Sequence, residues 1–308
     1  MISFSVNFKY TSLIDLIYVR SECRMFTIII PTHNRPKTLL MALESVKKII
    51  DPSIDEVIVV DDGSSIHARV IVPQELFTEL RLRIIRRHKS GGPAAARNTA
   101  IVQVTSDYII FLDDVVVFSD DFLVQLKTIL QTYPEVRAIQ ANCLDPYKDN
   151  VCNKIWLIAL QMHIHSCPIY AGDIRHVKVL GNAYVVKKTV FDEIGLFNEI
   201  LITGEDRELV SRMYAHHIPV FYFPQLNVYH YSRTTNFQVI KQFYANGKGH
   251  YLLKGDEPRM PRKTGQRKNM FIRNYFVLGI QEGLSVKSIT YTLLSRQLGM
   301  RAGIFSMK

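Results

Sequence analysis

The chain contains 308 residues, of which 47% are hydrophobic and 21% are charged, proportions typical of a globular protein. They exclude a disordered or collagen-like chain, and the length suits one large domain or two small ones. The longest apolar runs hold about seven residues, far fewer than the ~20 that a membrane-spanning helix requires. No small-residue cleavage site follows the apolar N-terminal run, and the four cysteines form no Cys-x-x-Cys pair. We therefore expect a cytoplasmic protein with reduced thiols.

The net charge of +10 is distributed unevenly along the chain. Residues 1–236 contain 25 Lys and Arg against 25 Asp and Glu, whereas residues 237–308 contain 13 against three. A basic segment of this kind indicates an anionic partner, either a membrane surface or a nucleic acid.

The first half of the chain alternates between apolar runs and helical patterns. Runs at 26–30, 56–60, 82–85 and 108–112 predict buried strands, the first of them ended by Pro31. A helix is expected to begin at Pro36, with apolar residues at i, i+3 and i+4 spacing as far as Ile50, and a second helix is expected over 93–100. This alternation is typical of an α/β protein whose parallel sheet is covered on both faces.

The second half is more mixed. Residues 178–186 suggest a strand pair or a buried turn, and 188–196 a short helix ended by a glycine. An amphipathic helix follows 204–206, a strand is expected over 219–223, and amphipathic helices with a basic linker follow residue 237.

Polar side chains follow three of the predicted strands: residues 33–35, residues 61–65, and the pair Asp113 and Asp114. Because the carboxyl ends of parallel strands meet at one edge of a sheet, these residues are expected to line a ligand crevice. Adjacent carboxylates there can hold a cation or bind a base and ribose hydroxyls. The alternative for each acidic pair is a turn in which the aspartates cap backbone groups or are solvated.

Two further segments carry candidate chemistry. The loop over 88–93 and the helix bearing Arg97 can bring backbone amides and a guanidinium to a diphosphate, although the loop lacks the P-loop pattern. Glu205 and Asp206 stand at a predicted helix start, where a carboxylate can act as a general base. The alternative for this acidic pair is a favourable interaction with the helix dipole.

Taken together, these segments resemble the inverting GT-A glycosyltransferases of family 2, from about Met25 to Tyr251. The segments that carry the resemblance are 28–35, 56–64, 91–98, 111–114, 181–183, 191–197, 204–206 and the strand end at Tyr229 and His230. Their order and spacing match the family. The resemblance implies an α/β, Rossmann-like nucleotide-diphospho-sugar transferase fold with a mixed, mainly parallel sheet flanked by helices. It also implies three parts: an extension over 1–24, a GT-A catalytic domain over 25–236, and a basic helical C-terminal region over 237–308.

The resemblance also assigns roles to individual residues. Those expected to bind the nucleotide are Pro31, Thr32, Asn34, Arg35, Asp61, Asp62, Gly92, Arg97 and Asp113. Asp113 would begin the Asp-x-Asp motif, which holds Mg²⁺ or Mn²⁺ on the donor diphosphate. Asp206, with Glu205 alongside, would deprotonate the acceptor hydroxyl.

The sequence departs from the family at Val115, which stands where the Asp-x-Asp motif has its second acid. Valine cannot ligate a cation. Asp114 could take over as the second ligand, His230 could complete the site, or catalysis could be weak or independent of metal. We favour a metal site on Asp113 and Asp114.

The resulting hypothesis is a family 2 hexosyltransferase that moves a sugar, with inversion, from a UDP-sugar to a hydroxyl of a glycan or lipid-linked acceptor in surface polysaccharide or glycolipid synthesis. The basic C-terminal region would hold it on the cytoplasmic face of the membrane; alternatively, that region packs on the catalytic core or on a second subunit in a homo-oligomer. No nucleic-acid partner is expected, because the α/β half is neutral and has no recognised RNA-binding motif. The rival hypothesis is a catalytically impaired homologue that binds a nucleotide-sugar or a glycan as an accessory subunit.

Overall fold

The computed structural model describes residues 25–231, apart from 52, 148–156, 159, 162–163, 166 and 202, together with a few isolated positions beyond 231. The expected extension over 1–24 and the basic region over 237–308 therefore lie almost entirely outside the described residues. The strands are β1 (Phe26–Thr32), β2 (Ile54–Asp61), β3 (Leu82–Arg86), β4 (Tyr108–Leu112), β5 (Val116–Phe118), β6 (Ala138–Leu144), β7 (Ile169–Ala171), β8 (Ile174–Val177), β9 (Ala183–Lys187) and β10 (Val220–His230). The helices are α2 (Pro36–Ile49), α3 (Ala68–Ile71), α4 (Gln74–Glu79), α5 (Gly92–Ile101), α6 (Phe122–Thr132), α8 (Lys188–Ile194) and α9 (Glu205–Ala215).

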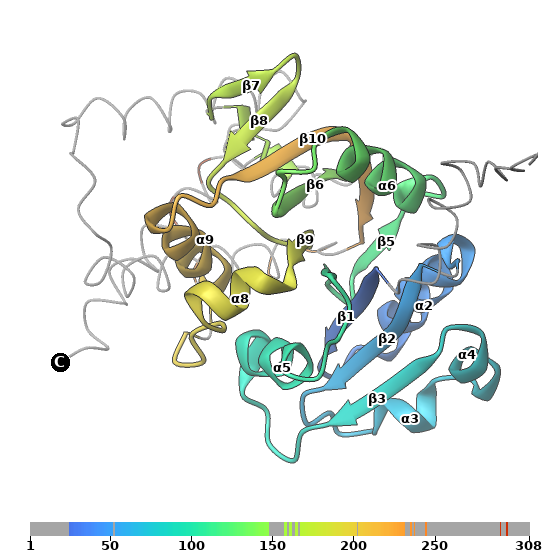
Figure 1. Cartoon of the computed structure of the whole chain (residues 1–308). Helices are drawn as coiled ribbons and strands as arrows, with labels where there is room; N and C mark the ends of the chain where they lie inside the picture. The colour runs from blue at the N-terminus through green and yellow to red at the C-terminus, as the bar shows by residue number, and fades with distance from the viewer. Residues whose placement is uncertain are drawn as a thin grey trace, which may run out of the picture.

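All ten strands of the described part of the chain belong to one mixed sheet in the order β3-β2-β1-β4-β9-β6-β10-β8-β7, with β5 paired to β10 (Figure 1). The four strands from β3 to β4 are parallel, which confirms the expected α/β half. On the other side, β9 runs antiparallel to both β4 and β6. The fold is therefore the predicted α/β class, with a parallel core that becomes mixed beyond β4.

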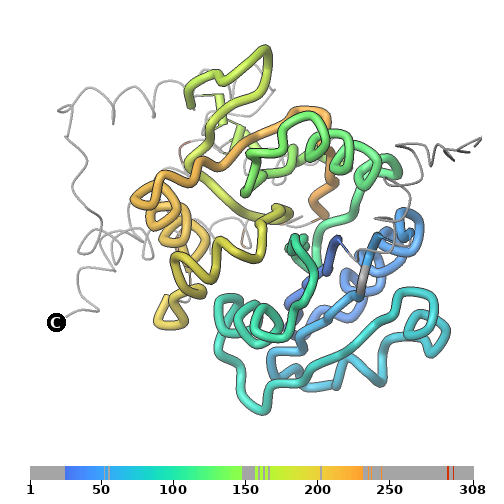
Figure 2. The backbone as a smooth tube through the Cα atoms, in the orientation of Figure 1, coloured from blue at the N-terminus to red at the C-terminus, as the bar shows by residue number. Residues whose placement is uncertain are grey.

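The order of the parallel strands creates a switch point between β1 and β4. The chain moves outward from β1 to β2 and β3, then returns across β1 through α5 to β4. Because such crossovers are right-handed, the return places α5 on the opposite face from α2, as Figure 1 shows. A switch point opens a crevice at the carboxyl ends of the neighbouring strands, where ligands bind in sheets of this kind. The backbone trace in Figure 2 follows the same path from α5 into β4.

Burial explains why these segments form strands and helices. Ile28, Ile29 and Ile30 in β1 have no exposed surface, so their continuous apolar run packs on both faces of the sheet. In α2 the buried positions recur every three or four residues, which leaves the other face of this helix in solvent. Pro36 begins α2 at a position where its missing N–H costs no helical hydrogen bond.

The first strand extends further than expected. It continues through Pro31 to Thr32, so the prediction that Pro31 ends it is wrong. Pairing with β4 stops at Ile29, whereas pairing with β2 continues to Thr32. Proline is tolerated here because it lies beyond the β4 ladder, near the end of the strand.

The second half resolves the mixed segment. Residues 178–182 form the connection into β9, with Asn182 at a φ of 62°, and only 183–187 form a strand. Gly195 ends α8 at a φ of 79°, as expected. The strand expected over 219–223 extends to His230 as β10. Within the described part of the chain, no helix has the length and apolar character needed to cross a membrane.

Candidate active site

The crevice between β1 and β4 is crossed by hydrogen bonds to Asp114. The Thr32 hydroxyl, at the end of β1, donates to Oδ2 of Asp114 at 2.8 Å. Nη1 of Arg35, just before α2, donates to Oδ1 at 2.9 Å. Asp114 is only 3% exposed, and burial raises the pKa of its carboxyl despite the opposing effect of Arg35 and Thr32. Both of its oxygens therefore already have donors within the protein.

Asp61 is the last residue of β2 and stabilises the loop that follows. Its Oδ1 accepts from the Ser64 backbone amide at 2.8 Å, and its Oδ2 from the Ala68 amide at 2.9 Å. Arg86 on β3 reaches the same Oδ2 at 3.3 Å. Burial opposes ionisation of this carboxyl, but the bonds from Ala68 and Ser64 hold its pKa below the ordinary value.

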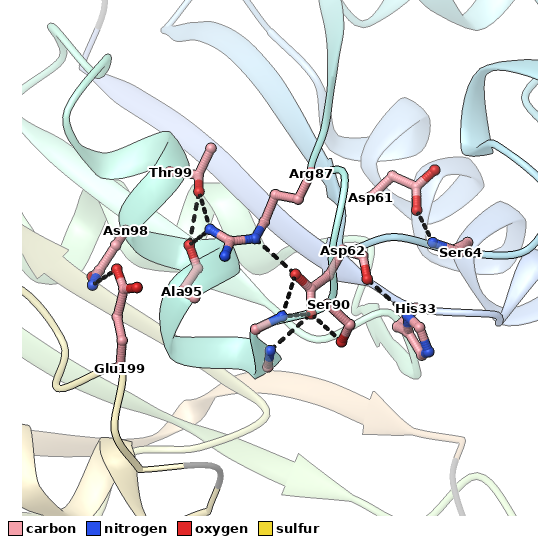
Figure 3. Close-up of polar contacts among 12 residues, drawn as sticks. His33, Asp61, Asp62, Ser64, Arg87, Ser90, Ala95, Asn98, Thr99 and Glu199 are labelled. Atoms are coloured by element: carbon pink, nitrogen blue, oxygen red, sulfur yellow. Dashed lines mark hydrogen bonds and ion pairs between the residues drawn. The ribbon is translucent and has the colours of Figure 1, made fainter.

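Asp62 anchors the start of α5 (Figure 3). Its carboxylate accepts from the backbone amides of Gly91 and Gly92 and from the Ser90 hydroxyl, and it pairs with Nε of Arg87 at 2.8 Å. The amides expected to receive a donor diphosphate are thus directed at a protein carboxylate. The expected contacts of Asp61, Asp62 and Gly92 with a nucleotide remain predictions.

Arg97 joins the donor and acceptor sides of the predicted site. It lies on α5 and is 4% exposed. Its Nη2 donates to Oδ1 of Asp113, just after β4, and its Nη1 donates to Oε1 of Glu205, the first residue of α9, both at 2.8 Å. The side chain of Asp113 is 31% exposed, which leaves this carboxylate partly open to the crevice. Three segments spread over more than a hundred residues of sequence therefore meet at one guanidinium.

Asp206 lies beside this group, at the second position of α9. Burial, and then the neighbouring Glu205 carboxylate, raise the pKa of Asp206 to about 7, against the opposing charge of Arg97. A Cβ built on Gly181 would lie 3.4 Å from Oδ2 of Asp206, so the segment before β9 packs directly against this carboxylate. A general base is most effective when its pKa is near the working pH, and Asp206 meets that condition.

A pocket of about 220 Å³ lies between the end of β1, the start of α2 and the β2–α3 loop. Its lining includes Thr32, Asn34 and Arg35 from the β1 end and Ser64 and Ser65 from the β2–α3 loop. The backbone of Asn34 has a φ of 55°, and its side chain accepts from the Ser65 amide at 2.7 Å. Three of the predicted nucleotide-binding residues, Thr32, Asn34 and Arg35, thus line the same cavity. Pro31 directly precedes Thr32 in β1.

The predicted metal ligands Asp113, Asp114 and His230 lie on neighbouring segments of the backbone. His230, 2% exposed at the end of β10, is paired in register with Val116 of β5, and the Tyr231 amide donates to the Val115 carbonyl at 2.7 Å. Across the described residues, no three His, Cys, Asp or Glu side chains are grouped closely enough to hold a metal by themselves. Asp113 fits one ligand position, because Arg97 occupies only one of its oxygens, whereas Asp114 fits poorly because donors reach both of its oxygens. Mg²⁺ commonly takes one or two carboxylates, with water and substrate phosphates completing the shell.

Three participants in this arrangement are absent from the sequence-based prediction. The Tyr184 hydroxyl is fully buried and has no hydrogen-bond partner among the described residues, and its ring lies 5.8 Å from the Arg97 guanidinium. Arg87 is the partner of Asp62, and Asn98 bonds the segment before α9. Asn98, inside α5, and Arg87, directly after β3, are recognisable in the sequence as polar residues, but no sequence signal marks their partners.

The first comparison with known proteins is with models of protein families. Residues 27–163 match the family model described as glycosyl transferase family 2. Over these residues the chain is similar to glycosyltransferase family 2. Among curated relatives, it is 34% identical over 100 residues to poly(ribitol-phosphate) beta-N-acetylglucosaminyltransferase TarS of Staphylococcus aureus, covering 32% of this chain and 16% of TarS. It is 30% identical over 204 residues to succinoglycan biosynthesis protein ExoU of Rhizobium meliloti, covering 61% of this chain and 56% of ExoU.

Solved structures show the same fold. The mannosyltransferase PcManGT of Pyrobaculum calidifontis superposes with a TM-score of 0.63 at 14% identity, covering 94% of this chain and 93% of that one. The structure of S. aureus TarS superposes with a TM-score of 0.56 at 15% identity, covering 92% of this chain and 55% of TarS. These likenesses confirm the GT-A fold. The chain spans well under two thirds of the curated relatives TarS and ExoU.

Proposed function

We propose that this protein transfers a sugar from a nucleotide-diphosphate donor, a UDP-sugar, to a hydroxyl of a glycan or lipid-linked acceptor, with inversion. The observation that carries the proposal is the Arg97 bridge, which holds Asp113 at the end of β4 close to the acidic start of α9. The likeness to TarS, solved with UDP-GlcNAc and with UDP, and to PcManGT, solved with GDP-Man and Mn²⁺, supports a nucleotide-sugar donor. The names of TarS and ExoU support a surface-polymer pathway.

In the proposed reaction each residue has a defined task. Thr32, Asn34 and Arg35 bind the nucleoside side of the donor in the pocket at the β1 end. Asp113 receives the diphosphate end, where a bound Mg²⁺ or Mn²⁺ would neutralise the leaving phosphates. Asp206 takes the proton of the acceptor hydroxyl as the new bond to the anomeric carbon forms and the bond to the diphosphate breaks. A single displacement of this kind inverts the configuration.

The test is the release of nucleoside diphosphate from a panel of UDP-sugars and GDP-mannose, with and without Mn²⁺ and candidate acceptors. The wild-type protein is expected to turn over at least one donor, and Asp206→Asn to lower kcat by about a thousandfold, within the range of general base catalysis. UDP binding by Asp206→Asn, measured by calorimetry, should remain within about twofold of wild type, because this residue serves the acceptor side.

Two results would contradict the proposal. Donor binding without turnover on any acceptor would favour the rival role as a nucleotide-sugar-binding accessory subunit. Turnover that survives Asp206→Asn would remove Asp206 as the base.

A further inference from the structure

Glu205 and Asp206 are adjacent in sequence but face different partners. Successive residues of a helix point about 100° apart around its axis, so the side chains of two neighbours face different directions. Glu205 is buried with its Oε1 on Arg97 at 2.8 Å. Asp206 has its Oδ2 toward Gly181, in the segment before β9. The acidic pair is therefore divided: Glu205 pairs with Arg97, and Asp206 packs against the segment before β9.

The guanidinium between Asp113 and Glu205 is held from several directions. Besides its two carboxylate bonds, it lies 5.8 Å from the ring of Tyr184 and 5.5 Å from the ring of Phe197, within the range of a cation–π contact. Removing one partner of a buried charge is strongly destabilising, so the buried Arg97 guanidinium depends on both carboxylates.

Helix α5 gives this bridge a fixed base. At its start, the Asp62 carboxylate receives the Gly91 and Gly92 amides. One residue after Arg97, the side chain of Asn98 donates to the Phe197 carbonyl at 2.9 Å and accepts from the Phe197 amide at 3.0 Å. The helix that carries Arg97 is thus tied both to the β2 end and to the segment leading into α9.

We propose that Arg97 and Glu205 are positioning residues, which together fix the spacing between the donor-side carboxylate of Asp113 and the acceptor-side carboxylate of Asp206. Glu205, expected from the sequence to act beside Asp206, does not take the acceptor proton in this assignment. The inference rests on the proposed function and specifies which acid of the pair is the base. It matters for rate because a misplacement of about 1 Å in a catalytic group can cost about a hundredfold.

The test compares Glu205→Gln with Asp206→Asn in the full-length protein. The glutamine keeps an oxygen that can accept from Arg97 but removes the charge, so kcat should fall only about tenfold, against about a thousandfold for Asp206→Asn. Arg97→Lys should weaken UDP binding about tenfold as well as lower kcat, because an ammonium cannot hold two carboxylates in the fork geometry. The variant that combines Arg97→Lys with Glu205→Gln should have a kcat no lower than that of Arg97→Lys alone, since both changes break the same bridge.

Glu208→Gln is the matched control. Glu208 lies in the same turn of α9 but pairs with Arg212 at 2.7 Å, away from Asp113, so its loss should change kcat by less than about twofold. The proposal is overturned if Glu205→Gln is as inactive as Asp206→Asn while its Tm stays within about 2 °C of wild type. It is also overturned if the effects of Arg97→Lys and Glu205→Gln simply add.

Two further outcomes, an unfolded variant and an inactive wild-type protein, have their own tests. If Glu205→Gln fails to fold, Glu205→Asp replaces it: retention of activity within about tenfold supports positioning, and a thousandfold loss contradicts it. If the wild-type protein turns over no donor, the proposed function fails. The effect of Arg97→Lys on UDP affinity then still decides whether the bridge positions Asp113.

Discussion

The Asp206 carboxylate is partly buried beside a second carboxylate, an arrangement that disfavours its ionised form. Since burial and Glu205 raise its pKa to about 7, the group is protonated, and unable to accept a proton, in acidic solution. The positive charge of Arg97 and a hydrogen bond from the Arg207 backbone amide lower this pKa, whereas the charge of Asp113 raises it. We expect kcat/KM for sugar transfer to fall about tenfold for each pH unit below about 7. An activity that stays level down to pH 5 in the wild-type protein would show that another group takes the proton.

The same burial predicts an effect on stability. The folded state holds the Asp206 proton more tightly than the unfolded state, so its contribution to stability is present below the unfolded pKa of about 4 and is lost as pH rises through about 7. Asp206→Asn carries no charge to bury, and its Tm at pH 8 should exceed that of wild type by about 2–4 °C for each kcal/mol recovered. The difference should vanish near pH 4. A variant that is inactive and also less stable at pH 8 would instead indicate a misfolded site.

At the scale of elements, the Asp62 carboxylate fixes helix α5 to the end of β2. Asp62→Ala leaves Nε of Arg87 and the Gly91 and Gly92 amides without their acceptor, and we expect it to lower the free energy of unfolding by about 2–4 kcal/mol. Urea denaturation measures this directly. The exposed Asp120 provides the control, and Asp120→Ala should change stability by less than about 0.5 kcal/mol. Equal stability of the two variants would mean that Asp62 does not anchor the helix.

The elements also show how far the sequence could predict this protein. Helix α2 and the strands from β1 to β4 followed from apolar periodicity, because each reflects local spacing between neighbours in the chain. Strand β5 and helix α6 were not predicted. Strand β5 pairs with β10, more than a hundred residues away, and no local pattern reports such a partner.

The candidate site divides in the same way. From the order of the motifs we expected Asp113, Asp114, Arg97 and Asp206 to lie near the carboxyl ends of the parallel strands. The motifs did not predict which carboxylate pairs with which arginine. Arg97 pairs with Glu205 across 108 positions, and Asp114 receives Thr32 and Arg35 from the other side of the switch point. Such choices depend on the packed arrangement, which only the structure supplies.

For the whole molecule, the binding of the basic region over 237–308 to a membrane remains a prediction. With 13 Lys and Arg against three acids, this region should bind anionic lipid, each basic side chain near the surface contributing about 1 kcal/mol. The full chain is expected to pellet with vesicles containing phosphatidylserine and to be released at 0.5 M salt. At this salt concentration the Debye length lies between ~3 and ~10 Å, so the attraction between the charges is largely screened. Equal pelleting with purely zwitterionic vesicles, or none with either, would favour packing of this region on protein instead.

In the proposed reaction the donor and acceptor groups meet at the β1–β4 switch point, bridged by Arg97. The most direct test is a crystal structure with UDP and Mn²⁺, using the anomalous signal to locate the metal. We predict the uridine against Thr32 and Arg35, with the diphosphate and the metal at the open oxygen of Asp113. Asp206 should lie across the vacant sugar position. A nucleotide bound elsewhere, with Asp113 and Asp206 facing no common space, would contradict the account.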